Sequence, residues 1–169
     1  MNQLEKFAEI STFFFDIDGV FTNNTLLITD QGEFLRSMNV RDGYAVKRAI
    51  RAGYQIVVIT GGSSSGVQSR LQGLGIEHIY MGKEQKLEVF DRLVVEMDLE
   101  PGEILYLGDD LPDYPVMRKV GLPCCPADAV PEIMGLSKYV SPYKGGEGCV
   151  RDVIEKVMRI RGEWDIPQS

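Results

Sequence analysis

The sequence predicts an α/β fold, in which helices flank one parallel sheet, and three observations support that prediction. Short runs rich in β-branched or aromatic residues alternate with segments that have apolar residues at helical spacing. The first run, residues 13–15, is apolar at every position, as expected of a strand covered on both faces. Asp16, Thr60 and Asp109 each follow such a run, and parallel strands bring their carboxyl ends to one edge of the sheet.

The same alternation gives the order of the elements. The strands are bounded by glycine or polar residues and are expected at residues 12–16, 55–60, 78–80, 103–107, 121–124 and 138–140. The helices are expected between them, at residues 43–52, 63–74, 84–97, 114–119, 131–134 and 149–161, after a helical lead-in within residues 1–11.

Caps and glycines set the expected helix ends. Asp42 is expected to cap the helix at 43–52, and the serines at 63–65 are expected to cap the next one. Gly53 and Gly75 follow these two helices, at the position where glycine commonly ends a helix.

Residues 23–38 interrupt the alternation with two β-prone runs that flank a turn at residues 30–32. This pattern is typical of a β-hairpin with a bulge. A hairpin alone is marginally stable and has open edges, so we expect a second copy of the chain to cover it, which predicts a homo-oligomer. Packing against its own domain is the alternative. Residues 162–169 are expected to form a polar tail after the last helix.

Length and composition restrict the class of protein. A chain of 169 residues suits one domain with a hydrophobic core, so residues 1–169 are expected to form a single unit. A net charge of −7 argues against nucleic acid or an anionic membrane as a partner. No apolar run approaches the ~20 residues of a membrane span, and residues 1–6 lack a signal-peptide pattern, which predicts a cytoplasmic protein. The three cysteines have no Cys-x-x-Cys spacing and predict neither disulfides nor a zinc site.

The acids after the first strand indicate a chemistry. Asp16 and Asp18 stand two residues apart, and Gly19 allows the chain to turn sharply behind them. Two carboxylates this close repel each other unless a proton or a cation intervenes, and Mg²⁺ prefers oxygen ligands. In phosphoryl transfer one aspartate can be the nucleophile, while a second acid protonates the leaving oxygen and then activates water.

The other strand ends supply the remaining parts of such a site. The Thr60 hydroxyl and the Gly61 amide are expected to hold phosphoryl oxygens. Lys86 is expected to neutralise the nucleophile and the phosphoryl group, and Asp109 to complete the shell of a metal.

Four motifs in this chain, in this order, resemble those of the haloacid dehalogenase (HAD) superfamily. They are Asp16-Ile17-Asp18-Gly19-Val20, Ile59-Thr60-Gly61, Lys86, and Gly108-Asp109-Asp110-x-x-Asp113. Further segments between residues 13 and 161 narrow the resemblance to the 3-deoxy-D-manno-octulosonate 8-phosphate (KDO 8-phosphate) phosphatases. These segments are Asn39-Val40-Arg41-Asp42-Gly43, Val120-Gly121-Leu122, Ala127-Asp128-Ala129 and Gly145-Gly146-Glu147-Gly148.

The resemblance implies a Rossmann-like (HAD-like) sheet with a β-hairpin and no cap domain. It also implies Mg²⁺-dependent hydrolysis of KDO 8-phosphate through an aspartyl-phosphate, in lipopolysaccharide sugar synthesis, by a homotetramer that the hairpins assemble. In the family pattern Asp16 is the nucleophile and a metal ligand, and Asp109 is a second ligand. Asp18 is the acid/base and binds the metal through its main-chain carbonyl, while Thr60 and Lys86 match the phosphoryl-binding pair.

Other positions match the family's substrate contacts or its supporting residues. The substrate contacts are Asn39, Arg41, Asp42, Gly43, Lys47, Gly61, Gly62 and Arg70. Asp110 and Asp113 match supporting positions that are not themselves metal ligands.

Two alternatives stay open. Gly62 and Glu147 stand where many family members carry arginine, and a related group that acts on the nine-carbon KDN 9-phosphate also carries Gly-Gly-Glu-Gly. Two features argue against membership of that group. Its members tend to carry an acid at the position of Gly62, and this chain has the Asn39-Val40-Arg41-Asp42-Gly43 segment of the KDO 8-phosphate phosphatases. A phospho-accepting receiver module has similar parts, but here the threonine and the lysine precede the second acid cluster, which is not the order of a receiver.

Overall fold

A computed structural model describes residues 2–168, whose core is a six-stranded parallel sheet in the order β5-β4-β1-β6-β7-β8. The strands are β1 (Thr12–Phe15), β4 (Gln55–Ile59), β5 (His78–Tyr80), β6 (Ile104–Leu107), β7 (Leu122–Cys125) and β8 (Tyr139–Val140). Each lies within two residues of its expected position, and the α/β prediction is confirmed.

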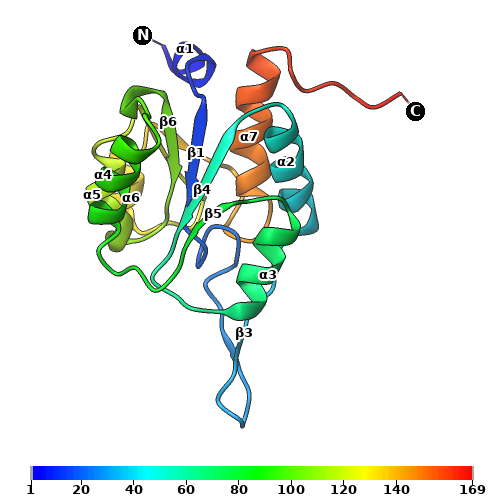
Figure 1. The fold of residues 1–169 in the computed structure, drawn as a ribbon, viewed down its shortest axis with the longest axis vertical. Helices are drawn as coiled ribbons and strands as arrows, with labels where there is room; N and C mark the ends of the chain where they lie inside the picture. The colour runs from blue at the N-terminus through cyan, green and yellow to red at the C-terminus, as the bar shows by residue number, and fades with distance from the viewer. Residues whose placement is uncertain (1, 169) are drawn as a thin grey trace.

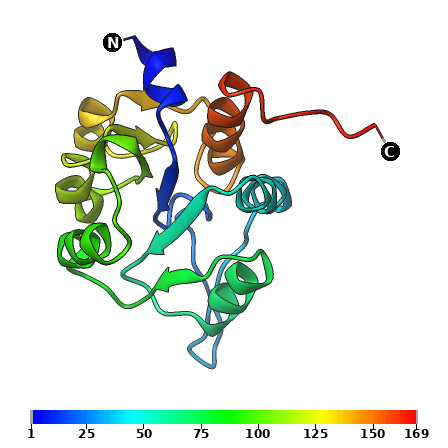
Figure 2. The ribbon, with the colours of Figure 1, turned by 45° about the horizontal axis from the view of Figure 1, so that its top comes forward.

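Helices cover both faces of this sheet (Figures 1 and 2). One face packs against α2 (Val40–Arg51), α3 (Ser65–Gly73) and α7 (Cys149–Ile160), and the other against α4 (Lys86–Glu96), α5 (Tyr114–Met117) and α6 (Pro131–Leu136). The shorter elements are α1 (Gln3–Ala8) and two 3₁₀ turns, η1 (Pro101–Glu103) and η2 (Leu111–Asp113). The helix expected at 114–119 begins at Tyr114 as predicted but ends at Met117, two residues early, with Arg118 as its C-cap.

The three phenylalanines of β1 explain why this strand is central. All three are fully buried, and they alternate between the two faces. Phe13 and Phe15 stack at 5.9 Å in the core under α2 and α7, whereas Phe14 meets Phe90 of α4 at 5.3 Å. Consecutive apolar residues in a strand require cover on both faces of the sheet, as observed for residues 13–15.

The order of the strands places a crevice beside β1. The chain passes from β1 to β4 on one side and returns later to β6 on the other, so the direction of winding reverses between β1 and β6. The Asp16 amide donates to the Leu107 carbonyl at 3.2 Å, which keeps the two strand ends aligned. Such a switch point is where open α/β sheets bind ligands.

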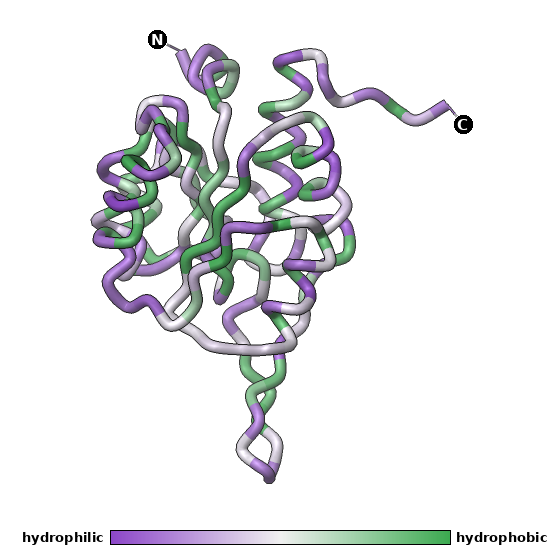
Figure 3. Tube along the Cα trace, viewed as in Figure 1, coloured by the Kyte–Doolittle hydropathy of each residue, from purple (hydrophilic) through white to green (hydrophobic). Residues whose placement is uncertain are grey.

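The expected hairpin is present within residues 23–38. β2 (Leu27–Ile28) pairs with β3 (Phe34–Leu35) in antiparallel register, and the loop between them extends away from the sheet (Figure 1). Hydrophobic residues line both of its strands (Figure 3).

The cap of α2 differs from the prediction. The helix begins at Val40, and its N-cap is Asn39, whose side chain accepts a hydrogen bond from the Arg41 amide at 2.8 Å. Asp42 lies fully buried in the first turn, and its Oδ1 accepts from the Arg151 amide of α7 at 2.9 Å. The prediction that Asp42 caps its own helix is therefore wrong. Asp42 caps the first turn of α7 instead, whose N-cap, Gly148, has no side chain to do so.

The expected polar tail is partly packed. Trp164 is only 8% exposed, and Arg48 lies over its ring at 4.3 Å from the centroid. Tyr44 meets the same ring at 6.2 Å, so the beginning of the tail docks on α2. Met1 and Ser169, at the ends of the expected lead-in and tail, lie outside the described residues.

Candidate active site at the ends of β1, β4 and β6

The three strand-end residues that the sequence singles out meet at one cavity. Asp16 directly follows β1, Thr60 directly follows β4, and Asp109 follows β6 after Gly108. The cavity has a volume of about 420 Å³. The predicted site residues that line it are Asp16, Asp18, Thr60, Gly61, Gly62, Lys86, Asp109 and Asp110.

Asp16 is buried and held from one side. Its Oδ1 accepts a hydrogen bond from the Ile17 amide at 2.7 Å and lies 3.0 Å from Lys86 Nζ. Burial and the nearby charge of Asp113 raise the pKa of Asp16 to about 7, although Lys86 works in the opposite direction. Within residues 2–168 no hydrogen bond engages Asp16 Oδ2, so this oxygen is available to a ligand.

Asp113 ties the cluster together, and both of its oxygens are occupied. Oδ1 accepts from Lys86 Nζ at 2.7 Å and from the Tyr106 hydroxyl at 2.7 Å. Oδ2 accepts from the Asp109 amide at 3.0 Å and from the Asp110 amide at 3.4 Å. Asp113 thus holds both Lys86 and the loop that carries Asp109.

Lys86 stays charged in this setting. It opens α4 and its side chain is 3% exposed. Burial alone would lower the pKa of Lys86, but the charges of Asp113 and Asp16 outweigh that effect and raise it. The cation therefore sits between two carboxylates at the floor of the site.

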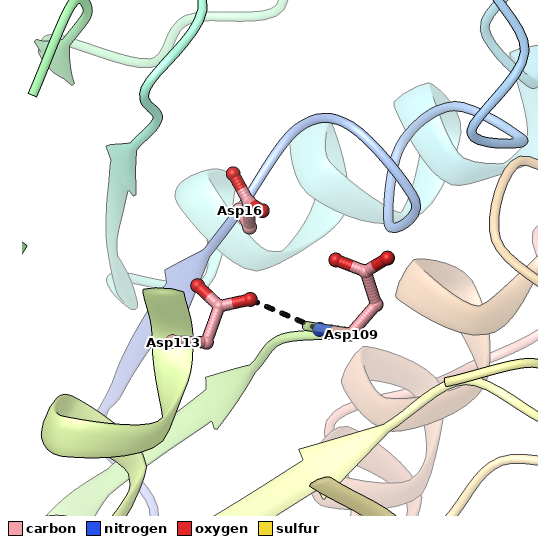
Figure 4. Close-up of side chains that lie close together, drawn as sticks. All are labelled: Asp16, Asp109 and Asp113. Carbon is pink, nitrogen blue, oxygen red and sulfur yellow. Dashed lines mark hydrogen bonds between the residues drawn. The ribbon is translucent and has the colours of Figure 1, made fainter. Parts of the chain in front are cut away.

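Three carboxylates come close enough to share a cation. One oxygen from each of Asp16, Asp109 and Asp113 lies within 4.8 Å of the others, and Figure 4 shows the side chains together. Because both Asp113 oxygens already have donors, Asp16 and Asp109 are the two that can offer a lone pair. The geometry thus favours Asp113 as a support for the cluster.

Of the three carboxylates in this cluster, Asp109 has a buried oxygen that accepts no hydrogen bond in the described residues. Its Oδ2 accepts from Asn24 Nδ2 at 2.8 Å, whereas its Oδ1 is buried and has no hydrogen-bond partner among residues 2–168. Burial raises the pKa of Asp109 to about 7. The carboxylate lies against Gly19, where a Cβ would be 1.9 Å from Oδ2, so a residue with a side chain would displace it. An oxygen-preferring cation would satisfy the unused atom.

Thr60 and the glycines after it form the opposite wall. The Thr60 side chain is 2% exposed, and its Oγ1 accepts from the Gly62 amide at 3.3 Å. The hydroxyl proton is therefore left for another acceptor. The Gly82 amide donates to the Gly62 carbonyl at 3.0 Å, and the Lys83 amide to the Thr60 carbonyl at 2.9 Å, which fixes this wall in place.

Several predicted substrate residues do not line this cavity in the structure of the single chain. Arg41 lines a separate cavity along α7 with Glu147 and Arg151. Asn39 donates from its side chain to the Gly146 carbonyl at 3.3 Å. Lys47 is exposed on α2.

Three more of the predicted substrate residues, Asp42, Gly43 and Arg70, belong to helix packing. The Arg70 guanidinium lies over Gly43, where a Cβ would be 2.6 Å from it. Asp42 has no exposed surface, which argues against its contact with substrate. These substrate roles stay predictions.

The structure adds residues that the motifs do not include. Asn24 and Lys83 line the cavity, and Arg36 contacts Asp18. Asn24 and Arg36 belong to the stems of the hairpin, and no local sequence pattern connects them to residues 109 and 18. Lys83 precedes α4, while the motif spacing selects Lys86.

Known proteins resemble this chain along nearly its whole length. No protein-family profile matched it. The 3-deoxy-D-manno-octulosonate 8-phosphate phosphatase KdsC of Escherichia coli K12 is 36% identical over 162 residues, which cover 96% of this chain and 86% of that protein.

Solved structures agree with that similarity. The crystal structure of the 3-deoxy-D-manno-octulosonate 8-phosphate phosphatase from Yersinia pestis matches with a TM-score of 0.92 and 35% identity, over 95% of this chain and 86% of that one. The Moraxella catarrhalis phosphatase, in complex with magnesium, phosphate and KDO, matches with a TM-score of 0.89 and 29% identity, over 93% and 92%. No helix within residues 2–168 combines the length and the apolar character that crossing a membrane requires.

Proposed function

Because the chain belongs to the 3-deoxy-D-manno-octulosonate 8-phosphate phosphatases of the HAD superfamily, we propose that it hydrolyses KDO 8-phosphate to KDO and phosphate. It is a phosphoric monoester hydrolase of that family. The observation that carries the proposal is the position of Asp16, buried at the end of the central strand, bonded to Lys86 and open to the cavity. The reaction belongs to lipopolysaccharide sugar synthesis.

Asp16 is the proposed nucleophile. Its Oδ2, free of hydrogen bonds within residues 2–168, attacks the phosphorus while the bond from phosphorus to the sugar oxygen breaks, and Asp18 gives its proton to that oxygen. Water then attacks the aspartyl-phosphate, Asp18 takes the proton of the water, and the bond from phosphorus to Asp16 breaks. Both carboxyl groups return to their starting state.

Lys86, Thr60 and Gly61 stabilise the phosphoryl group in this proposal. Lys86 lies 3.0 Å from Asp16 Oδ1 and balances the charge of the nucleophile and of the phosphoryl oxygens. The Thr60 hydroxyl accepts a hydrogen bond from the Gly62 amide, so its own proton can be donated to a phosphoryl oxygen. Gly61 lines the cavity next to Thr60.

Mg²⁺ fits the donor set. Within residues 2–168 Asp109 Oδ1 is buried without a hydrogen-bond partner, and burial raises the pKa of both Asp16 and Asp109. A bound cation would stabilise the charged form of both carboxylates. Asp16, Asp109 and the main-chain carbonyl of Asp18 are the proposed ligands. Bound there, Mg²⁺ neutralises charge on the phosphoryl oxygens.

Phosphate release from purified protein with Mg²⁺ tests the substrate. We expect a higher kcat/KM for KDO 8-phosphate than for KDN 9-phosphate, by about 10-fold or more, because the longer sugar needs a different site wall. The reverse preference would assign the nine-carbon alternative. Retention of one phosphate per chain without release would instead identify a receiver module.

We also propose a homotetramer assembled through the hairpin. Leu27, Ile28 and Phe34 are 65%, 63% and 56% exposed in the single chain. Apolar side chains this exposed on a two-stranded ribbon are typical of a surface that another copy covers.

Light scattering tests the assembly. Ile28→Asp places a charge in the proposed interface, and we expect it to shift the mass toward monomer without loss of fold. Val95→Asp is a matched control, because Val95 is 79% exposed on α4, far along the chain from the hairpin. An unchanged mass for Ile28→Asp would refute the role of the hairpin.

A further inference from the structure

The hairpin is bonded to the candidate active site at both of its stems. Before β2, Asn24 donates to Asp109 Oδ2 at 2.8 Å. After β3, Arg36 donates to Asp18 twice, from Nε to Oδ1 at 2.6 Å and from Nη2 to Oδ2 at 3.3 Å. The element that extends farthest from the sheet thus contacts two of the proposed catalytic carboxylates.

The pair of Arg36 and Asp18 has the features of a built contact. The Arg36 side chain is only 7% exposed, while that of Asp18 is 38% exposed and lines the cavity. A guanidinium that bonds both oxygens of a carboxylate fixes the plane of that group as well as its distance. Arg36 therefore fixes the Asp18 carboxylate from the hairpin, while Asp18 stays exposed to the cavity in which the substrate is proposed to bind.

Gly62 leaves the room that this pair occupies. A Cβ at position 62 would lie 3.2 Å from Asp18 Oδ2 and 3.3 Å from Arg36 Nη2, which is closer than ordinary van der Waals contact. The wall opposite the hairpin is thus shaped around the ion pair.

We propose that Arg36 is a positioning residue for Asp18, and this inference rests on the proposed function. A general acid works only within hydrogen-bond reach of the oxygen that it protonates, about 2.6–3.2 Å. An aspartate side chain that is free to rotate spends part of its time outside that reach. The two hydrogen bonds from the Arg36 guanidinium limit rotation of the Asp18 side chain. The hairpin thus orients the acid/base without contacting the substrate.

Leaving-group dependence tests the proposal. Phenyl phosphate and p-nitrophenyl phosphate have nearly the same shape, but the phenyl leaving group needs protonation far more. For Arg36→Met we expect kcat/KM to fall about 10-fold for phenyl phosphate and only about 2-fold for p-nitrophenyl phosphate, because misplaced acid catalysis is lost in the first case. Arg36→Lys keeps the charge and one donor direction, and we expect it to recover part of the loss.

Asn24→Gly is the matched contrast. It removes the other stem contact, and glycine suits the φ of 64° found at this position. Because Asn24 contacts Asp109, we expect a raised Mg²⁺ requirement and an equal loss for both aryl phosphates.

A readout other than activity accompanies these rates. In a crystal structure of the Arg36→Met protein we expect the Asp18 carboxylate to leave its present rotamer or to occupy more than one. Thermal unfolding and light scattering on the same protein show whether the fold and the mass are kept.

The outcomes separate this inference from the proposed function. Equal losses on the two aryl phosphates, no loss, or an unmoved Asp18 would overturn the role of Arg36. A differential loss in Arg36→Met together with no activity on KDO 8-phosphate would leave the inference standing and refute the substrate instead.

Discussion

Asp109 at the strand ends and Asp42 between α2 and α7 are alike when each is considered alone. Both are buried, and each has one oxygen without a hydrogen-bond partner in the described residues. Burial raises the pKa of both, to about 7 for Asp109 and about 6 for Asp42.

Their surroundings differ. Asp109 lies beside Asp16 and the Lys86–Asp113 pair at an open cavity, whereas Asp42 meets the first turn of α7 and does not line that cavity. A buried carboxylate with an unpaired oxygen therefore indicates a functional site only where other groups of matching chemistry converge. For Asp42 the described contact is the cap that its Oδ1 gives to α7.

The largest effect is expected from Asp16→Asn. The amide keeps the shape but cannot attack phosphorus, so kcat for phosphate release should fall by more than about 10⁴-fold. Asp42→Asn, measured in parallel, should keep most of the activity. Undiminished turnover by Asp16→Asn would remove the distinction between the two regions.

A smaller effect is expected from Asp109→Asn. The loss of a proposed ligand should lower activity by about 100-fold at limiting Mg²⁺ and shift the Mg²⁺ titration to higher concentration. Calorimetric titration with Mg²⁺ checks binding directly, and chelation with EDTA should abolish turnover of the unaltered protein. The same titration of Asp42→Asn should match the unaltered protein, and a weakened affinity there would contradict our interpretation.

The smallest effect concerns the pH dependence of stability. The pKa of Asp42 rises from 3.8 to about 6 on folding, so the folded state binds the proton more tightly and its stability falls as the pH rises through this range. Between about pH 5 and about pH 7.5, the unaltered protein should lose about 1 kcal/mol more than Asp42→Asn, which cannot titrate there. Urea unfolding of both proteins at the two pH values measures this difference, in which the titration of Asp16 and Asp109 cancels.

The sheet and the positions of its polar strand ends could be predicted because their causes are local. Apolar runs such as residues 13–15 require burial on both faces wherever they occur, and parallel strands bring residues that follow them to one edge. The cavity formed by Asp16, Thr60 and Asp109 follows from these two rules.

What could not be predicted depends on contacts between distant segments. Asn39 and Asp42 are both good caps by residue type, and only the packing of α7 against α2 decides which helix each one serves. Trp164 looks like part of a polar tail until Arg48 and Tyr44 bring it onto α2. The contact of Arg36 with Asp18 could not be predicted, because the hairpin lies between the two residues in the sequence.

The hydrogen bonds from Asn24 and Arg36 connect the carboxylates of Asp109 and Asp18 to the hairpin, which extends away from the cavity. A compound that displaces the neighbouring copies from the apolar strands of the hairpin and bends its stems would slow turnover while the cavity stays open to substrate. Such an inhibitor would not need to resemble a sugar phosphate. It would also keep its effect when substrate accumulates, since the two would not compete for the same space.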